Sequence, residues 1–86
     1  MIIKNKKIIG LILSHNCENL IKQTIDRIPD NLFDEVIVSD DGSTDNSVIK
    51  YKELGYRVFE TSIAGYGSNV QNGLKSAFSL DADYVV

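Results

Sequence analysis

The sequence has only one cysteine, Cys17, and no apolar run long enough to cross a membrane. A single cysteine cannot form a disulfide within the chain, which fits a protein of a reducing, cytoplasmic compartment. The formal net charge is −3 and lysine and arginine form no cluster, so the composition argues against a nucleic-acid partner. Membrane association would have to come from parts of the protein outside this chain.

Basic residues are absent between Arg27 and Lys50, whereas acids are frequent there. The acids of that span are Asp30, Asp34, Glu35, Asp40, Asp41 and Asp45. An anionic ligand that approaches this part of the chain would need a metal ion or a basic group from elsewhere, because like charges repel.

The length of 86 residues allows one domain at most. An apolar content of 43% with 24% charged residues is typical of a globular protein and not of a disordered one. The sequence ends within an apolar segment, at Tyr84, Val85 and Val86, without a cap or a polar tail. We therefore expect residues 1–86 to be the first part of a single longer domain, truncated after its fourth strand. The exposed edge of that strand is a surface through which the chain could self-associate.

Apolar β-branched runs alternate with segments of helical periodicity along the whole chain. The pattern predicts strands over residues 8–13, 35–39, 57–61 and 83–86, and helices over 18–28, 45–54 and 68–80. Short connections between alternating strands and helices imply a parallel sheet with right-handed crossovers. The predicted fold class is therefore α/β, a Rossmann-like sheet in the order of elements β-α-β-α-β-α-β.

The spacing of apolar residues predicts which side of each helix faces the sheet. The predicted inner residues are Ile21, Ile25 and Ile28 in the first helix, Val48, Ile49 and Leu54 in the second, and Val70, Leu74, Ala77 and Phe78 in the third. Helix ends are predicted from capping chemistry: Asn16 and Thr44 as N-caps, and Pro29 and Gly55 as stop signals.

A buried strand ends directly in Asp40 and Asp41, followed by Gly42 and Ser43. Ligands of open α/β sheets gather at the carboxyl ends of the strands. Carboxylates there can accept hydrogen bonds from a ribose or a base N–H, or can hold a divalent cation that in turn holds phosphates. The same residue types are also good turn formers, whose Asp side chains accept hydrogen bonds from backbone N–H groups. The position at the end of a buried strand favours the ligand site.

Two further loops leave the same ends of the sheet, over residues 14–16 and 62–67. His15 is the only histidine, and no second ligand lies at metal spacing. The glycines of residues 64–67 favour a turn that lets the next helix pack closely, more than a phosphate cradle. Gly73 inside that helix costs about 1 kcal/mol relative to Ala, which close approach to a strand or a ligand could offset. No Ser-His-Asp arrangement or paired general acid and base can be assembled.

Together these features resemble a family 2 glycosyltransferase of the GT-A fold, and within it the branch of polyprenyl-phosphate sugar transferases. The resemblance rests on the Ser-His-Asn end of the first strand, the Val-Ile-Val-Ser-Asp-Asp-Gly-Ser-Thr-Asp run of residues 36–45, and the glycine loop that leads to the fourth strand. It implies a site for a nucleotide-diphosphate-sugar. Asp40 and Asp41 would hold the base and ribose, and the helix with Gly67, Asn72 and Gly73 would pack beneath the pyrophosphate. The implied binding residues are Ser14, His15, Asn16, Asp40, Asp41, Gly42, Gly67 and Gly73.

The resemblance also implies chemistry that this chain does not hold. In the family, an Asp-x-Asp motif after the fourth strand binds Mg²⁺ or Mn²⁺, and a later carboxylate acts as general base in an inverting transfer. Asp81 and Asp83 precede the strand and are not that motif. The expected function is thus donor binding in an inverting glycosyltransferase, with no metal-binding or catalytic residue in this chain, no activity alone, and a polyprenyl phosphate or a glycan as acceptor. The alternative is a non-catalytic nucleotide-binding or interaction module.

Overall fold

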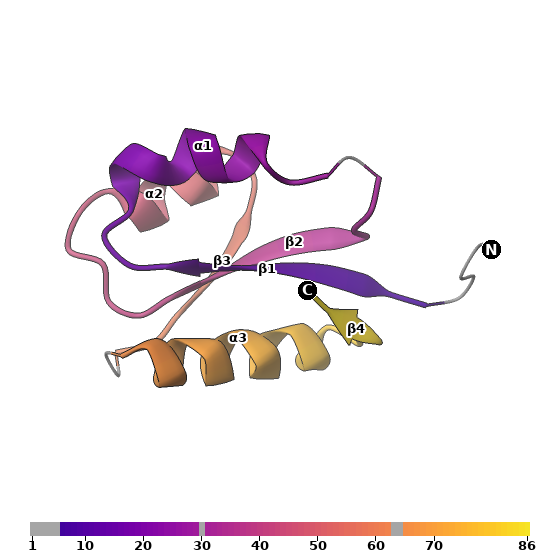
Figure 1. The fold of residues 1–86 in the computed structure, drawn as a ribbon. Helices are drawn as coiled ribbons and strands as arrows, with labels where there is room; N and C mark the ends of the chain where they lie inside the picture. Colours follow the sequence, from indigo (N-terminus) through magenta and orange to yellow (C-terminus); the bar gives the residue numbers. More distant parts are fainter. Residues whose placement is uncertain (1–5, 30, 63–64) are drawn as a thin grey trace.

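Four parallel strands form one sheet in the order β3-β2-β1-β4 in the computed structural model, which describes residues 6–29, 31–62 and 65–86. The strands are β1 (Ile8–Ser14), β2 (Glu35–Asp40), β3 (Arg57–Glu60) and β4 (Tyr84–Val85). The helices are α1 (Ile21–Asp26), preceded by the 3₁₀ turn η1 (Glu18–Leu20), then α2 (Ser47–Glu53) and α3 (Tyr66–Ser79). Helices α1 and α2 lie on one face of the sheet and α3 lies on the other (Figure 1). The predicted α/β fold is confirmed.

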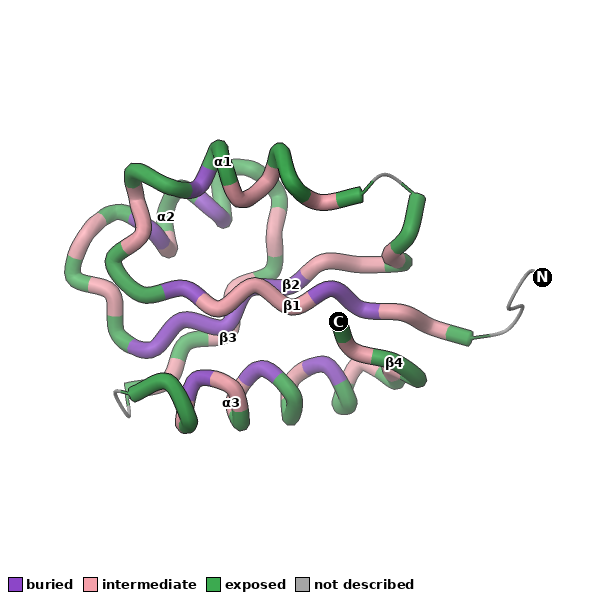
Figure 2. The backbone as a smooth tube through the Cα atoms, in the orientation of Figure 1, coloured by how far each residue is buried: buried purple, intermediate pink, exposed green. Residues whose placement is uncertain are grey.

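The core lies on both faces of the two central strands. Ile9 and Ile37 pack with Ala77 on the α3 side, and Val38 packs with Ile21 and Tyr51 under α1 and α2. Complete burial of an Ile or Val side chain contributes about 1.5–3 kcal/mol each. Strand β2 is therefore apolar on both faces, and the buried segments in Figure 2 follow β1, β2 and the inner side of α3.

The inner side of α2 differs from the prediction. Ser47 and Tyr51 are buried, whereas Ile49 and Leu54 are 57% and 58% exposed. The helix begins at Ser47, and residues four apart share a face, so Ser47 and Tyr51 point to the sheet. Ile49, two residues after Ser47, lies on the opposite side. Of the three predicted inner residues, only Val48 is half-buried.

The inner side of α3 was predicted only in part, since Ala77 is buried and Val70 is half-buried. Asn69, Gly73 and Ala77 are buried at intervals of four residues, whereas Phe78 is 56% exposed and Leu74 is exposed. A Cβ atom on Gly73 would lie 2.6 Å from Cδ2 of Leu11, so the side chain of Leu11 on β1 occupies the space beside the glycine. This contact with a strand explains a glycine inside the helix. Ala77 is the predicted inner residue that is buried.

The predicted first helix divides into η1 and α1, with Ile21 buried and Ile25 half-buried toward the sheet. Asn16 does not cap it. The N-cap of η1 is Cys17, and the side chain of Asn16 binds the second loop instead. Thr44 does not cap α2, whose N-cap is Asn46. The helix stop at Gly55 is confirmed, because Gly55 has a φ of 92° just after the C-cap Leu54.

Tyr84 and Val86 at the β4 edge are exposed, and self-association through this edge stays a prediction. Among the helices of the described residues, none is long and apolar enough to span a membrane.

Candidate functional site

The carboxyl ends of the three longest strands meet at one edge of the sheet. Ser14 pairs with Asp40 across β1 and β2, and Asp40 pairs with Glu60 across β2 and β3. The loops that leave these strands border a cavity of about 530 Å³. The cavity is lined by Leu13, Ser14, His15, Cys17, Asp41, Gly65, Tyr66 and Asn69. Three of the predicted binding residues, Ser14, His15 and Asp41, are thus brought together.

Asp40 builds the turn that carries the second loop. It is 1% exposed, and its Oδ1 accepts hydrogen bonds from the hydroxyls of Ser14 (2.8 Å) and Ser43. Its Oδ2 accepts from the backbone N–H groups of Gly42 (3.1 Å) and Ser43 (2.8 Å). A carboxylate offers about four acceptor positions, and all four are used within the protein. The turn also requires Gly42, whose φ is 95°.

The environment of Asp40 keeps its carboxylate ionised. Burial alone would raise the pKa of Asp40, but the hydrogen bonds from Ser43, Ser14 and Gly42 favour the charged form and hold the pKa below its usual range. Asp40 is therefore a buried anion whose charge is stabilised by hydrogen bonds from its own loops. A ligand would have to displace one of these donors to reach it.

Asp41 connects the three loops around the cavity. It is 7% exposed, and its Oδ1 accepts a hydrogen bond from Nδ1 of His15. Its Oδ2 accepts from the backbone N–H of Gly65 at 3.2 Å. Within residues 6–29, 31–62 and 65–86, these two bonds use half of the acceptor capacity of the carboxylate. Asp41 can therefore accept further hydrogen bonds from a ligand in the cavity that it lines.

The contact between His15 and Asp41 was not predicted from the sequence. The two residues are 26 positions apart, but each directly follows one member of the Ser14–Asp40 pair in the parallel ladder. Knowledge of this register would have placed them side by side. The side chain of His15 is 55% exposed, so the ring both holds Asp41 and remains accessible in the cavity wall.

The loops after β1 and β2 are joined by hydrogen bonds from the backbone of each loop to side chains of the other. Oδ1 of Asn16 accepts a hydrogen bond from the N–H of Thr44 (2.7 Å), and the N–H of Glu18 donates to Oδ2 of Asp45 (3.1 Å). Glu18 Oε1 in turn accepts from the N–H of Asn46 (3.3 Å). The pKa of Glu18 is lowered mainly by this last bond, and the pKa of Asp45 mainly by the hydroxyl of Ser47. The two helix N-termini thereby fix the spacing of the loops.

The other predicted glycines do not line the cavity. Gly67 is exposed in the first turn of α3, where none of the described residues would lie within 4 Å of an added Cβ, and Gly73 packs on Leu11. Ala64, part of the predicted glycine loop, lies outside the described residues. Five lining residues were not among the predicted binding residues: Leu13, Cys17, Gly65, Tyr66 and Asn69. Their shared signal is their position beside a strand end or at the start of α3.

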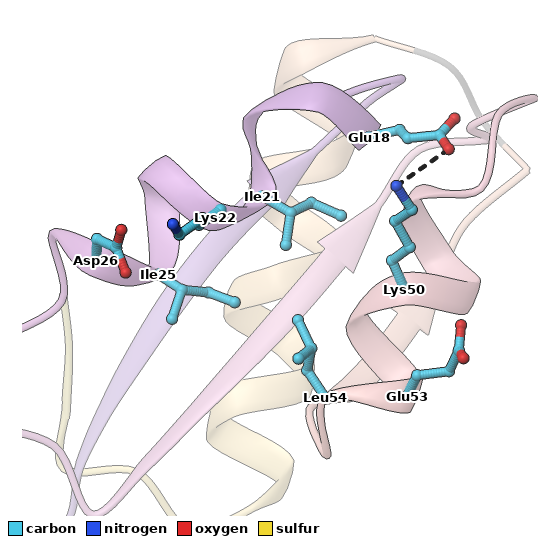
Figure 3. A pocket seen from close by; sticks show the side chains of 8 residues that line it. All are labelled: Glu18, Ile21, Lys22, Ile25, Asp26, Lys50, Glu53 and Leu54. Atoms are coloured by element: carbon cyan, nitrogen blue, oxygen red, sulfur yellow. Dashed lines mark ion pairs between the residues drawn. The ribbon is translucent and has the colours of Figure 1, made fainter.

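A second cavity, of about 470 Å³, lies between α1 and α2 (Figure 3). Ile21, Ile25 and Leu54 form its apolar part, and Lys50 forms an ion pair with Glu18 at 3.3 Å on its rim. None of the predicted binding residues lines it. The cavity at the strand ends is therefore the candidate site.

The described residues contain no group of three or more His, Cys, Asp or Glu side chains that could hold a metal ion. Asp83 lies at the opposite edge of the sheet, where its Oδ2 accepts a hydrogen bond from the backbone N–H of Lys7 at 2.7 Å. Its placement agrees with the expectation that Asp81 and Asp83 precede the fourth strand.

Comparison with known proteins yields a family and several solved structures. Residues 11–86 match the family model of Glycosyl transferase family 2. Glucosyl-3-phosphoglycerate synthase from Mycobacterium tuberculosis, solved with Mn²⁺, uridine diphosphate (UDP) and glucosyl-3-phosphoglycerate, superimposes with a TM-score of 0.72 and 30% sequence identity over 84% of this chain and 30% of that one. The same synthase solved with Mn²⁺, UDP and phosphoglyceric acid gives the same score and identity, over 84% of this chain and 29% of that one.

A structure described as a mycobacterial protein matches with 29% identity and a TM-score of 0.72, over 84% of this chain and 28% of that one. The chain therefore spans about 30% of the length of the structures that it matches. No match is found among curated proteins.

Proposed function

The chain belongs to glycosyl transferase family 2, and from this we propose that the cavity at its strand ends binds the nucleotide part of a nucleotide-diphosphate-sugar. The family match and the likeness to a synthase solved with UDP support the ligand class. The observation that carries the proposal is the position of the Asp41 carboxylate and its hydrogen bonds. This carboxylate lines the cavity, is held by His15 and by the N–H of Gly65, and retains acceptor capacity.

We assign the two acids different roles. Asp41 accepts hydrogen bonds from the ribose hydroxyls or from a base N–H, because these groups are donors. Asp40, with Gly42 and Asn16, keeps the loops in place and does not contact the ligand. Earlier in the chain, Ser14 and His15 form the wall next to the base. The phosphates point away from Asp41, because its carboxylate and the phosphates are both negatively charged and repel each other.

In the complete protein we propose an inverting transfer of the sugar to an acceptor. A divalent ion such as Mg²⁺ or Mn²⁺ would offset charge on the leaving nucleotide. The residues described here do not fit such an ion, so its ligands and the general base would lie elsewhere in the protein. We therefore expect this chain to bind donor without transferring sugar. A polyprenyl phosphate or a glycan remains the expected acceptor.

Titration calorimetry on the whole chain tests the proposal. UDP, GDP and dTDP and their sugar conjugates are each titrated, with and without Mn²⁺. We expect saturable binding of one nucleotide class, and a loss of affinity of tenfold or more in Asp41→Asn. The matched control is Asp81→Asn, since Asp81 is exposed and has a φ of 65° that Asn tolerates. A folded Asp41→Asn protein with unchanged affinity would contradict the assignment.

A further inference from the structure

A chain of buried and half-buried hydrogen bonds runs from α3 to the strand ends. Asn72 Nδ2 donates to the hydroxyl of Ser39 at 2.8 Å, and that hydroxyl donates to Oδ1 of Asn69 at 2.6 Å. Asn69 Nδ2 then donates to the carbonyl oxygen of Ser14 at 3.2 Å. Asn72 also donates to the carbonyl oxygen of Phe59 at 2.9 Å. The chain therefore links α3 to all three long strands.

The direction of this chain is fixed by its two ends. The carbonyl oxygens of Ser14 and Phe59 can only accept, so the NH₂ groups of Asn69 and Asn72 must face them. The single proton of the Ser39 hydroxyl must then point to Asn69, because Asn72 already donates to this oxygen. The hydroxyl also lies 2.9 Å from the backbone carbonyl oxygen of Asn69, so both acceptors available to its proton belong to Asn69.

The far end of the chain reaches the binding residues. The carbonyl oxygen of Ser14 accepts the side chain of Asn69 and also the backbone N–H of Asp41, at 3.3 Å. Asn69 is 3% exposed and forms part of the cavity lining, four residues after Gly65. The N–H of Gly65 in turn binds the carboxylate of Asp41. A shift of α3 along the sheet would therefore change the positions of both Asp41 and its partner.

We propose that Ser39, Asn69 and Asn72 are positioning residues for the nucleotide site. Their hydrogen bonds set α3 at one position on the strand ends and so fix the distance between Asp41 and Gly65. Burial of such amides and hydroxyls is unfavourable unless each is paired, so the chain acts as a unit: loss of one member leaves its neighbours unsatisfied. The predicted change in affinity rests on the proposed nucleotide site. The predicted change in the position of Asp41 does not depend on that proposal.

The affinity test uses residues that lie outside the cavity lining. Ser39→Ala and Asn72→Ala should each raise the Kd for UDP about tenfold in the whole chain, and the double variant should raise it no further. Ser76→Ala is the matched control on the same helix, because its hydroxyl donates to the backbone carbonyl oxygen of Asn72 one turn earlier, at 2.8 Å, and not to a strand. We expect its Kd to stay within twofold. The folded fraction of each variant is measured by urea denaturation, and Kd values refer to that fraction.

Amide resonances in the ligand-free protein give the second readout. Ser39→Ala and Asn72→Ala should both shift the backbone N–H signals of Asp41 and Gly65, whereas Ser76→Ala should not. If the parent chain binds no nucleotide, the proposed function fails while this readout still tests the positioning. Unchanged Asp41 and Gly65 signals in folded variants, or losses of affinity that multiply in the double variant, would overturn the inference.

Discussion

Ser14 and Asp40 pair directly across β1 and β2, and the hydroxyl of Ser14 donates a hydrogen bond of 2.8 Å to the carboxylate of Asp40. The contact joins the ends of the two central strands at the point where the loops of the candidate site begin. Both residues are buried, so the bond is shielded from water.

Replacement of Ser14 by alanine should destabilise the protein. The change removes one of four donors from a buried carboxylate, and a hydrogen bond to a charged group contributes about 1.5–3 kcal/mol. We expect the free energy of unfolding, measured in urea, to fall by about 2 kcal/mol. Ser79→Ala is the control, since its hydroxyl forms an exposed bond within α3. An equal loss of unfolding free energy in the two variants would show that the Ser14–Asp40 bond contributes no more than an exposed hydrogen bond.

Asp40→Asn should lower stability at neutral pH and weaken its dependence on acid. Each oxygen of Asp40 accepts two donors. An NH₂ group at the Oδ2 position would face two backbone N–H groups, and at the Oδ1 position it would force the hydroxyls of Ser14 and Ser43 to turn and accept. The pKa of Asp40 in the folded state is below its ordinary value of 3.8. Its charge therefore adds stability that is complete above the ordinary pKa and is lost as the pH falls through the lower, folded value.

The measurement is the free energy of unfolding of parent and variant between pH 7 and pH 2. The difference between them should be largest above the ordinary pKa of the carboxyl and should decrease below it. Glu18 and Asp45, whose pKa values are also lowered, contribute equally to both proteins and cancel in the difference. A difference that stays constant to pH 2 would show that the charge of Asp40 is not what the turn needs.

Gly73→Ala should destabilise the protein although alanine favours helices. The added Cβ would lie 2.6 Å from the Leu11 side chain, and overpacking of this kind costs about 1–3 kcal/mol. Gly67→Ala in the same helix is the control, because nothing lies within 4 Å of its added Cβ. This control should be neutral or up to about 1 kcal/mol more stable. Leu11→Ala in the Gly73→Ala background should recover part of the loss if the clash is the cause.

The strands and the location of the acidic turn could be predicted from the sequence, but the faces of two helices could not. Residues 36–39 are a β-branched run that ends in polar residues, which is sufficient to place β2 and its end. Helix faces were predicted from apolar residues alone. In α2 and α3 the buried positions include Ser47, Asn69 and Gly73, which are selected by hydrogen bonds and by close approach to a strand. Those causes exist only once the sheet has formed.

The same limit applies to the site. The sequence indicated that Asp40 could serve either in a turn or in a ligand site. Only the structure distinguishes Asp40, whose acceptor positions are used within the protein, from Asp41, which lines the cavity. The partner of Asp41 was not visible, because His15 becomes its neighbour only through the register of β1 and β2.

The bond between His15 and Asp41 should control nucleotide affinity through the direction of the carboxylate. His15→Phe keeps a ring in the cavity wall but removes the donor, whereas His15→Asn removes the ring but keeps an NH₂ donor. If His15 contributes through its bond to Asp41, the Kd for UDP should rise about five- to tenfold in His15→Phe. This is the change expected for the loss of a hydrogen bond of about 1–1.5 kcal/mol. The rise should be smaller in His15→Asn. In the Asp41→Asn background the two substitutions should have similar, small effects, because the carboxylate that they orient is gone. Stability should change little in either variant, since the His15 side chain is more than half exposed. Full affinity in His15→Phe with a loss in His15→Asn would instead assign the residue to ring contact with the base.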